Sequence, residues 1–178
     1  VQINSSTDDA EEKGLNASSG TGAIDLTSSD IELTNDGGDG DQFIGLRFTN
    51  ITIPQGVVIT NAYIQFTVDE TDNSPGSVIF KVEDVDNSTT FTSTAFDISG
   101  RTTGTDSVIW SNIPAWTNAG DAGADQATPN LSVLVQSIVN RAGWQSGNAL
   151  NFIITGTGQR TAEASDGSSS QAAVLNIE

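Results

Sequence analysis

The sequence predicts an all-β protein, a jelly-roll-like β-sandwich that carries one short amphipathic helix. Short apolar runs recur along the chain with clusters of Gly, Asn, Asp and Ser between them. Apolar and polar residues alternate within the longer runs, and a single segment has helical spacing instead. A length of 178 residues suits one β-sandwich, so we expect residues 1–178 to form a single domain.

The strands are expected at residues 24–26, 31–33, 43–49, 58–70, 78–85, 108–110, 150–155 and 174–177. The clearest strand is 58–70, whose apolar positions include Ala62, Ile64, Phe66 and Val68. This period of two is typical of a strand with one dry face and one wet face, and we expect a ligand to lie on the wet faces. Residues 54–56, Pro-Gln-Gly, form the turn before this strand, and the Gly/Ser-rich residues 14–22 and 165–171 are predicted to be loops.

The helix is predicted over about residues 129–142. Its apolar positions fall at i, i+3, i+4, i+7 and i+8, the stripe of an amphipathic helix: Leu131, Leu134, Val135, Ile138 and Val139. Thr128 is the expected N-cap, Pro129 the first helical residue, and Gly143 the residue that ends the helix.

Composition restricts the function. The chain has 23 acidic and 6 basic residues and a formal net charge of -17, which repels nucleic acid and anionic lipid and attracts cations. It has no Cys and no His, so thiol nucleophiles, a histidine base and the usual zinc and copper ligands are missing. No apolar run is long enough for membrane insertion. The acidic, Lys-poor, Ser/Thr/Asn/Gly-rich composition resembles modules that marine or salt-adapted bacteria secrete, so we expect an extracellular or cell-surface location and an export signal already removed.

Acidic residues gather in three places: residues 8–12, the loop with Asp36, Asp39 and Asp41, and residues 69–72. Crowded carboxylates on Gly-rich loops suit Ca²⁺, which takes six to eight oxygen ligands in flexible geometry. None of the clusters has the spacing of an EF-hand loop. The sequence therefore predicts a structural calcium ion, and the alternative for any one cluster is a solvated acidic surface.

Aromatic residues are the candidates for stacking on a sugar ring. Trp110 and Trp116 flank the loop WSNIPAW, and Trp144 follows the helix. An exposed indole stacks on the C–H face of a pyranose, but tryptophan is usually buried, so packing in the core is the alternative for each of them. Tyr63 lies on the predicted wet face beside Gln65, and strand alternation supports its exposure.

Arg47 is the cation expected to meet a ligand. Alternation in strand 43–49 places its side chain outward, within reach of a sulfate or a uronate. The alternative is a cross-strand ion pair with Asp69 or Glu83. The other arginines are expected to form structural ion pairs in so acidic a chain.

The order of motifs resembles that of bacterial secreted β-sandwich modules of the DNRLRE and carbohydrate-binding-module type. The resemblance spans nearly the whole chain and rests on SSTDDAEE, SSDIEL, GLRF, IPQG, ITNAYIQFTVDE, WSNIPAW, TPNLSVLVQSIVNRAGWQSGNAL, GTGQRTAEASDG and AAVLNIE. Such modules are attached to polysaccharide-degrading enzymes and large surface proteins. The resemblance implies structural calcium bound by Asp9, Glu11, Asp69 and Glu70. An arginine-rich signature matching the family name is missing, so the resemblance supports the fold more strongly than the ligand.

These observations together predict a non-catalytic carbohydrate-binding module, stabilised by calcium, that forms part of a larger secreted protein. Its polysaccharide would stack on Tyr63 or an exposed tryptophan, with Gln65 and Asn151 binding hydroxyl groups and Arg47 binding any acidic group. The first alternative is a structural or adhesion module of a large surface protein that calcium makes rigid. A polysaccharide lyase or glycosidase is the less favoured alternative, because no carboxylate pair stands out.

Overall fold

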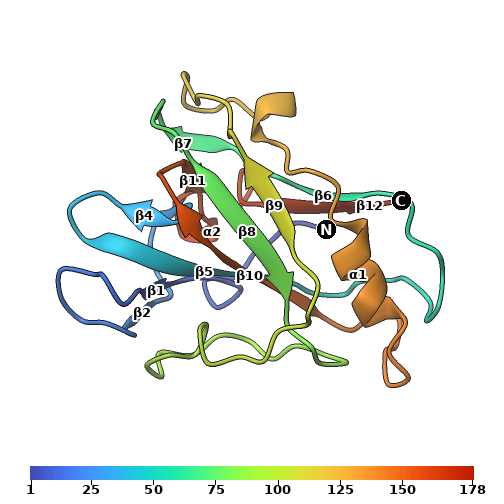
Figure 1. Cartoon of the computed structure of the whole chain (residues 1–178). Coiled ribbons are helices and arrows are strands. Elements are labelled where there is room, and N and C mark those ends of the chain that lie inside the picture. The colour runs from blue at the N-terminus through green and yellow to red at the C-terminus, as the bar shows by residue number, and fades with distance from the viewer.

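The computed structural model describes all of residues 1–178 and is mostly β, which confirms the predicted all-β class (Figure 1). Its strands are β1 Asp9–Lys13, β2 Ile24–Asp25, β3 Asp30–Glu32, β4 Asn35–Asp36, β5 Gly40–Phe48, β6 Ala62–Gln65, β7 Val68–Glu70, β8 Ser77–Val82, β9 Val108–Ser111, β10 Leu150–Thr157, β11 Thr161–Glu163 and β12 Val174–Ile177. Its helices are α1 Ser132–Val139, α2 Ser165–Ser168 and the 3₁₀ turn η1 Ala124–Gln126. None of these helices has the length and apolar character needed to cross a membrane.

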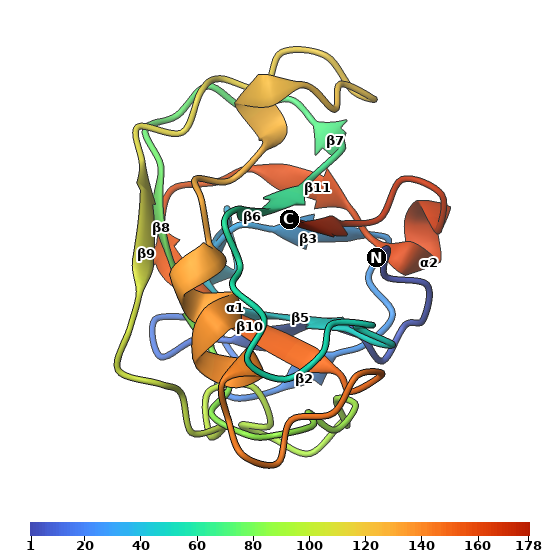
Figure 2. The same ribbon diagram turned by 90° about the vertical axis from the view of Figure 1, so that its right-hand side faces the viewer.

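The strands form two layers. The larger sheet has the order β2-β1-β5-β10-β8-β9, and β4 pairs with β5 at one end. The opposite layer consists of a three-stranded sheet, β3-β11-β7, and a two-stranded sheet, β12-β6. All of these pairs are antiparallel. Figure 2 shows the two layers edge on, with β5 and β10 below, β3, β6 and β11 above, and α1 at one side.

The core lies between the layers and contains 32 buried residues. The alternation predicted for residues 58–70 is confirmed, because Ala62, Ile64, Phe66 and Val68 are all buried. The single predicted strand is nevertheless two strands, β6 and β7, separated by Phe66 and Thr67. The chain changes partner at this break, since β6 pairs with β12 and β7 with β11.

Helix α1 is shorter than the predicted helix over residues 129–142. The side-chain oxygen of Asn130 accepts the N–H groups of Ser132 at 2.8 Å and Ala62 at 3.1 Å, and Thr128 Oγ1 accepts the N–H of Ile64 at 3.0 Å. These bonds hold residues 128–131 against strand β6, so the helix begins only at Ser132. The predicted apolar stripe is confirmed, because all five of its residues are buried.

A long loop, residues 84–104, covers part of the outer face of the larger sheet. The ring of Phe91 lies over Gly45 of β5, so close that a Cβ atom at Gly45 would be 2.3 Å from it. The Arg101 guanidinium lies 4.3 Å from the centre of the same ring. Phe91 is buried with Ile98 of the loop and Ile153 of β10 in a second, smaller apolar cluster. Part of the face that the alternation of polar residues predicted to be wet is therefore covered by protein.

Candidate functional site

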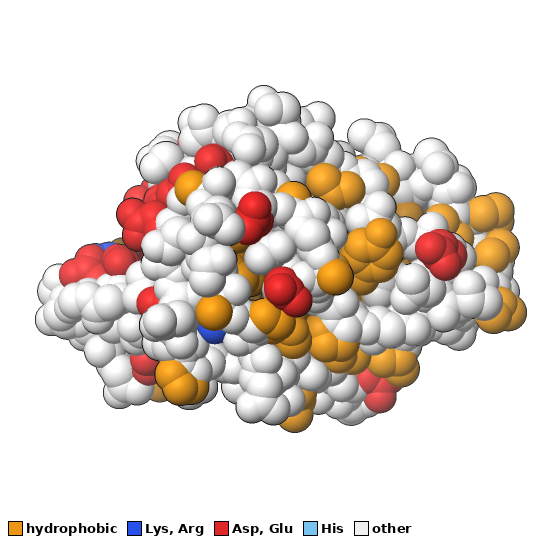
Figure 3. Space-filling model, turned by 90° about the horizontal axis from the view of Figure 1, so that it is seen from above, with side chains coloured by type: hydrophobic (Ala, Val, Ile, Leu, Met, Phe, Trp, Pro, Cys, Tyr) orange, Lys and Arg blue, Asp and Glu red, His pale blue; other side chains and the backbone are white.

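Three carboxylates meet on the three-stranded sheet of the opposite layer. Asp30 from β3 and Asp69 and Glu70 from β7 place carboxylate oxygens within 4.8 Å of one another. We call these residues the acidic triad. Asp30 and Asp69 are half-buried and Glu70 is exposed. Viewed from above, acidic side chains gather at the left of the molecule, and the few basic side chains in view lie on the same side (Figure 3).

Glu163 of β11, the central strand of this sheet, extends the acidic triad. Strand pairing sets Glu163 directly opposite Asp30. Partial burial raises the pKa of the Glu163 carboxyl, and the neighbouring charges of Asp69 and Asp30 raise it further. Four carboxyl groups from three adjacent strands are therefore held together by the backbone pairing of β3, β11 and β7.

No basic side chain forms an ion pair with the acidic triad. Lys81 lies on β8 of the other sheet and makes no ion pair, and the remaining five cations pair elsewhere: Lys13 with Asp39, Arg47 with Asp8, Arg101 with Glu83 and Asp97, Arg141 with Asp84 and Asp86, and Arg160 with Asp72. Carboxylates this close repel one another when they are all ionised. The acidic triad therefore lacks a counter-charge within the chain.

Asp9 and Glu11, which the resemblance associates with Asp69 and Glu70, lie elsewhere. Both are buried on β1, where protein groups use their oxygens. Asp9 accepts the backbone N–H and the hydroxyl of Ser165 at 2.7 and 3.0 Å. Glu11 accepts the backbone N–H of Glu32 at 2.8 Å. The acidic opening of the chain thus joins β1 to other segments, and its carboxylates are not gathered with the acidic triad.

Asp36, Asp39 and Asp41 were predicted as metal ligands, and in the structure the carboxylates of Asp39 and Asp41 have different protein partners. Asp39 forms an ion pair with Lys13 at 2.7 Å, and this hydrogen bond lowers the pKa of the Asp39 carboxyl. Asp41 accepts a hydrogen bond from Asn16 at 2.6 Å. Asp36 lines a cavity of about 360 Å³ and has a raised pKa, mainly because of burial and then because of Asp39.

Glu11 and Glu32 line the same cavity. Burial raises the pKa of Glu11 well above its ordinary value, and the adjacent Glu32 carboxylate raises it further. Burial also raises the pKa of Glu32. Two carboxyl groups in contact in a buried position share a proton more readily than they carry two charges.

The structure places all three tryptophans in the core. The exposed fractions are 6% for Trp110, 1% for Trp116 and 2% for Trp144. The indole N–H of Trp116 donates to the carbonyl of Asp125 at 3.1 Å, and that of Trp144 donates to the carbonyl of Ile53 at 2.9 Å. The packing alternative is thus favoured over an exposed stacking platform for Trp110 and Trp116.

The polar residues predicted to bind sugar hydroxyls are already engaged. Gln65 donates from its side-chain amide to the carbonyl of Gly123 at 3.0 Å. Asn151 is fully buried on β10 and donates to Glu83 at 3.2 Å, while its side-chain oxygen has no partner. Tyr63 of β6 is half-buried, which leaves part of its ring accessible. The structure does not bring these three residues together on one open face.

Arg47 is held by the protein. Its Nη1 lies 2.6 Å from Asp8, and its Nε donates to the carbonyl of Ser88 at 2.9 Å. The ion pair expected as the alternative is thus present, although the partner is Asp8 and neither Asp69 nor Glu83. Asp8 directly precedes β1, and backbone pairing of Arg47 with Asp8 at 2.7 Å explains the choice of partner.

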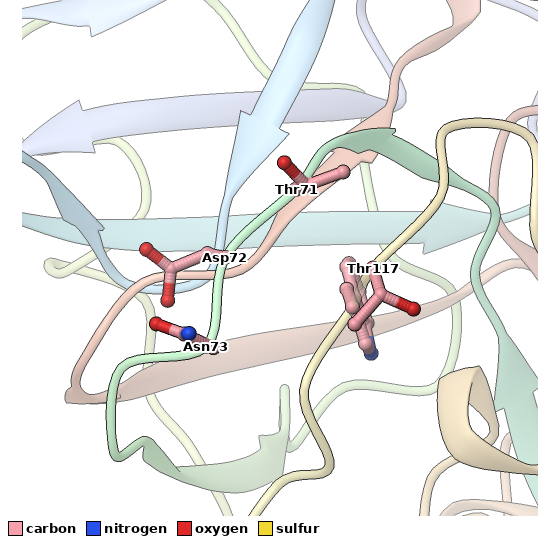
Figure 4. A pocket seen from close by; sticks show the side chains of 5 residues that line it. Thr71, Asp72, Asn73 and Thr117 are labelled. Atoms are coloured by element: carbon pink, nitrogen blue, oxygen red, sulfur yellow. The ribbon is translucent and has the colours of Figure 1, made fainter.

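A polar groove of about 310 Å³ lies immediately after β7 (Figure 4). Five residues line it: Thr71, Asp72, Asn73, Trp116 and Thr117. In the close-up, the side chains of Asp72 and Asn73 lie on one side and that of Thr117 on the other. We call this the Asp72 groove; it follows Glu70 directly in the chain, so it adjoins the acidic triad.

Some of these residues are missing from the predicted site. The alternation around Ile31 indicates that Asp30 points outward, but nothing in the sequence shows that β3 lies two strands from β7. Glu163 is the last residue of a three-residue strand that lacks apolar periodicity. Thr71, Asn73 and Thr117 belong to irregular segments, and their meeting depends on the long-range pairing of Asp72 with Trp116.

Comparison with known proteins gives no identification. No protein-family model matches the chain, and none of the curated proteins matches it in sequence.

Proposed function

We propose that this chain is a non-catalytic β-sandwich module of a secreted or cell-surface protein and that it binds calcium at the acidic triad. The observation that carries the proposal is the convergence of Asp30, Asp69 and Glu70 without a basic partner. Each residue belongs to a paired strand, so the carboxylates are positioned by the fold. A divalent cation supplies the positive charge that the chain itself does not supply there.

The residues fit calcium better than the other common metals. Ca²⁺ binds oxygen ligands at about 2.3–2.6 Å, so two ligands on opposite sides of the ion are about 5 Å apart. The separation of at most 4.8 Å within the acidic triad agrees with this spacing. Zinc and copper prefer nitrogen or sulfur ligands, and the chain has neither His nor Cys. Glu163, backbone carbonyls and water would complete the six to eight positions that calcium requires.

A calcium ion at this position would link strands that are not neighbours. Asp30 lies on β3 and Asp69 on β7, and β11 runs between them. Without an ion, the repulsion between the carboxylates opposes this arrangement; with an ion, the same charges hold the edges of the sheet together. Calcium would therefore make this layer rigid, as expected of a module in a large extracellular protein.

The test compares thermal unfolding in calcium and in EDTA. Extracellular calcium sites have dissociation constants of about 10⁻⁴–10⁻³ M, and a ligand present at 100 times its dissociation constant stabilises the fold by about 2.7 kcal/mol. We expect 10 mM calcium to raise the melting temperature by several degrees. The double variant Asp69→Asn/Glu70→Gln should abolish the increase, whereas Asp106→Asn, an exposed acidic residue without a partner, should preserve it. Identical curves for the natural chain in calcium and EDTA, or an increase that survives in the double variant, would contradict the proposal.

Polysaccharide recognition is the second candidate function, and the observation that favours it is the Asp72 groove. With Trp110 and Trp116 buried, recognition by stacking on an exposed indole is not supported. A polar groove binds sugar by hydrogen bonding, and such weak sites gain strength when several modules act together. A hydrolase or lyase activity would instead release reducing ends or unsaturated products from a polysaccharide, which we do not expect.

A further inference from the structure

We infer that the Asp72 groove is a binding site for a neutral saccharide. The inference rests on the second candidate function and goes further, because it assigns the site and the class of sugar. Its evidence is the hydrogen-bonding capacity of the groove, the rigidity of its walls and the local balance of charge.

The groove is built around a fixed carboxylate. Asp72 Oδ1 accepts three hydrogen bonds, from Arg160 at 2.9 Å and from the backbone N–H and hydroxyl of Ser74 at 2.6 Å each. Its other oxygen, Oδ2, accepts none from the protein. A carboxylate oxygen that is held in place and has free lone pairs is a ready acceptor for sugar hydroxyl groups.

The opposite wall is equally fixed. The backbone N–H and carbonyl of Trp116 exchange two hydrogen bonds of 2.9 Å with those of Asp72. The indole N–H of Trp116 donates to the carbonyl of Asp125 at 3.1 Å, which fixes this buried side chain behind the groove. Thr117 lies beside it at the surface and adds a hydroxyl group. Binding would therefore cost little conformational entropy in these segments.

The remaining lining residues supply both donors and acceptors. The side chain of Asn73 is exposed and makes no hydrogen bond within the protein, and Thr71 contributes a hydroxyl group that has no partner within the protein. A set of one carboxylate, one amide and two hydroxyls matches a ligand with several adjacent hydroxyl groups. At about 310 Å³, the groove is at the small end of ligand sites, which suits one or two sugar rings of a longer chain.

The charge around the groove selects against acidic sugars. The buried guanidinium of Arg160 pairs with Asp72 and is surrounded by carbonyl groups of Ile113, Pro114 and Ser74, so it is not accessible to a ligand. Asp72 is the only charged residue that lines the groove. With a formal net charge of -17 on the whole chain, a uronate or a sulfated sugar would be repelled.

The test uses backbone amide NMR of the full chain with cellotetraose, mannotetraose and agarotetraose as neutral probes and trigalacturonate as the anionic one. We expect at least one neutral tetrasaccharide to shift the amide signals of Thr71, Asn73 and Thr117, and trigalacturonate to leave them unchanged. Asn73→Ala should weaken this binding about five-fold, the loss of one hydrogen bond. Its matched control is Asn4→Ala, an exposed asparagine with no side-chain hydrogen bond, which should bind like the natural chain.

The outcomes separate the site from the function. Saccharide-induced shifts confined to another surface, such as that of Tyr63, with no effect of Asn73→Ala, would refute the groove but retain polysaccharide recognition. No shift with any neutral probe would overturn both the groove and the second candidate function. Stronger shifts with trigalacturonate than with the neutral probes would overturn the charge argument. The calcium proposal is independent of these results, because melting in calcium and EDTA tests it separately.

Discussion

Replacing Glu12 with alanine tests whether the acidic opening of the chain has a structural role. Glu12 is 1% exposed and accepts hydrogen bonds from the backbone N–H groups of Ile98 and Ser99, each at 2.8 Å, and from the Ser99 hydroxyl. These three bonds attach loop 84–104 to strand β1. No basic residue forms an ion pair with Glu12, so these hydrogen bonds are its polar contacts within the fold.

The expected loss of stability follows from these donors. In Glu12→Ala, the N–H of the fully buried Ile98 has no partner, which costs about 1–3 kcal/mol. Ser99 is at the surface, so water can accept the hydrogen bonds that its N–H and hydroxyl groups no longer donate to Glu12. Adding the lost packing of the side chain, we expect a decrease of about 2–4 kcal/mol in the free energy of unfolding.

Urea unfolding measures this decrease, and amide hydrogen exchange shows where it arises. We expect faster exchange at Ile98 and Ser99, and the same loss of stability in calcium and in EDTA. Glu70→Ala is the matched control, because Glu70 is exposed; in EDTA it should not destabilise the protein. A loss below about 1 kcal/mol would refute the structural role of Glu12. A loss seen in calcium alone would also refute it and would favour Glu12 as a metal ligand.

Three further predictions concern the fold. Gly45→Ala should lower the free energy of unfolding by about 1–3 kcal/mol because its Cβ would meet the Phe91 ring, and Gly45→Ala/Phe91→Ala should lose less than the sum of the two single changes in urea unfolding. If the losses of stability in the two single variants add up in the double variant, the Phe91 ring moves away from the new Cβ atom freely. Because the pKa of Glu11 is raised in the folded protein, the folded state keeps a proton that the unfolded chain has released, so stability should fall as pH rises from about 4.3 toward the raised pKa. Urea unfolding in EDTA should show a shallower pH dependence for Glu11→Gln; an unchanged slope would contradict the assignment. Arg160→Met should cost about 3–5 kcal/mol by urea unfolding, because it leaves Asp72 and several carbonyl groups without their buried donor, and a loss below about 1 kcal/mol would argue against this network.

Periodicity predicted the parts of the fold that depend on local sequence. The alternation of Ala62, Ile64, Phe66 and Val68 and the helical stripe of α1 both describe buried faces correctly, because burial of an apolar face is what produces each pattern. The helix boundary was wrong, since the side chain of Asn130 bonds to Ala62, a residue far away in the sequence.

Long-range contacts account for what periodicity missed. Strand β1 has the sequence DAEEK, in which buried carboxylates occupy positions usually held by apolar residues, so composition alone indicated a surface cluster. Its carboxylates find backbone donors in segments as distant as Ser165 and Ser99. Asp69 and Glu70 were predicted as metal ligands, but their companion Asp30 depends on the pairing of β3 and β7 with β11, which one sequence does not reveal.

A crystal structure of the chain grown in calcium, with anomalous scattering measured to identify the ion, tests the central claim most directly. The account predicts an ion bound by Asp30, Asp69 and Glu70 with oxygen ligands at about 2.3–2.6 Å. An acidic triad that holds water alone in saturating calcium, or calcium bound at Asp36, Asp39 and Asp41 instead, would contradict it.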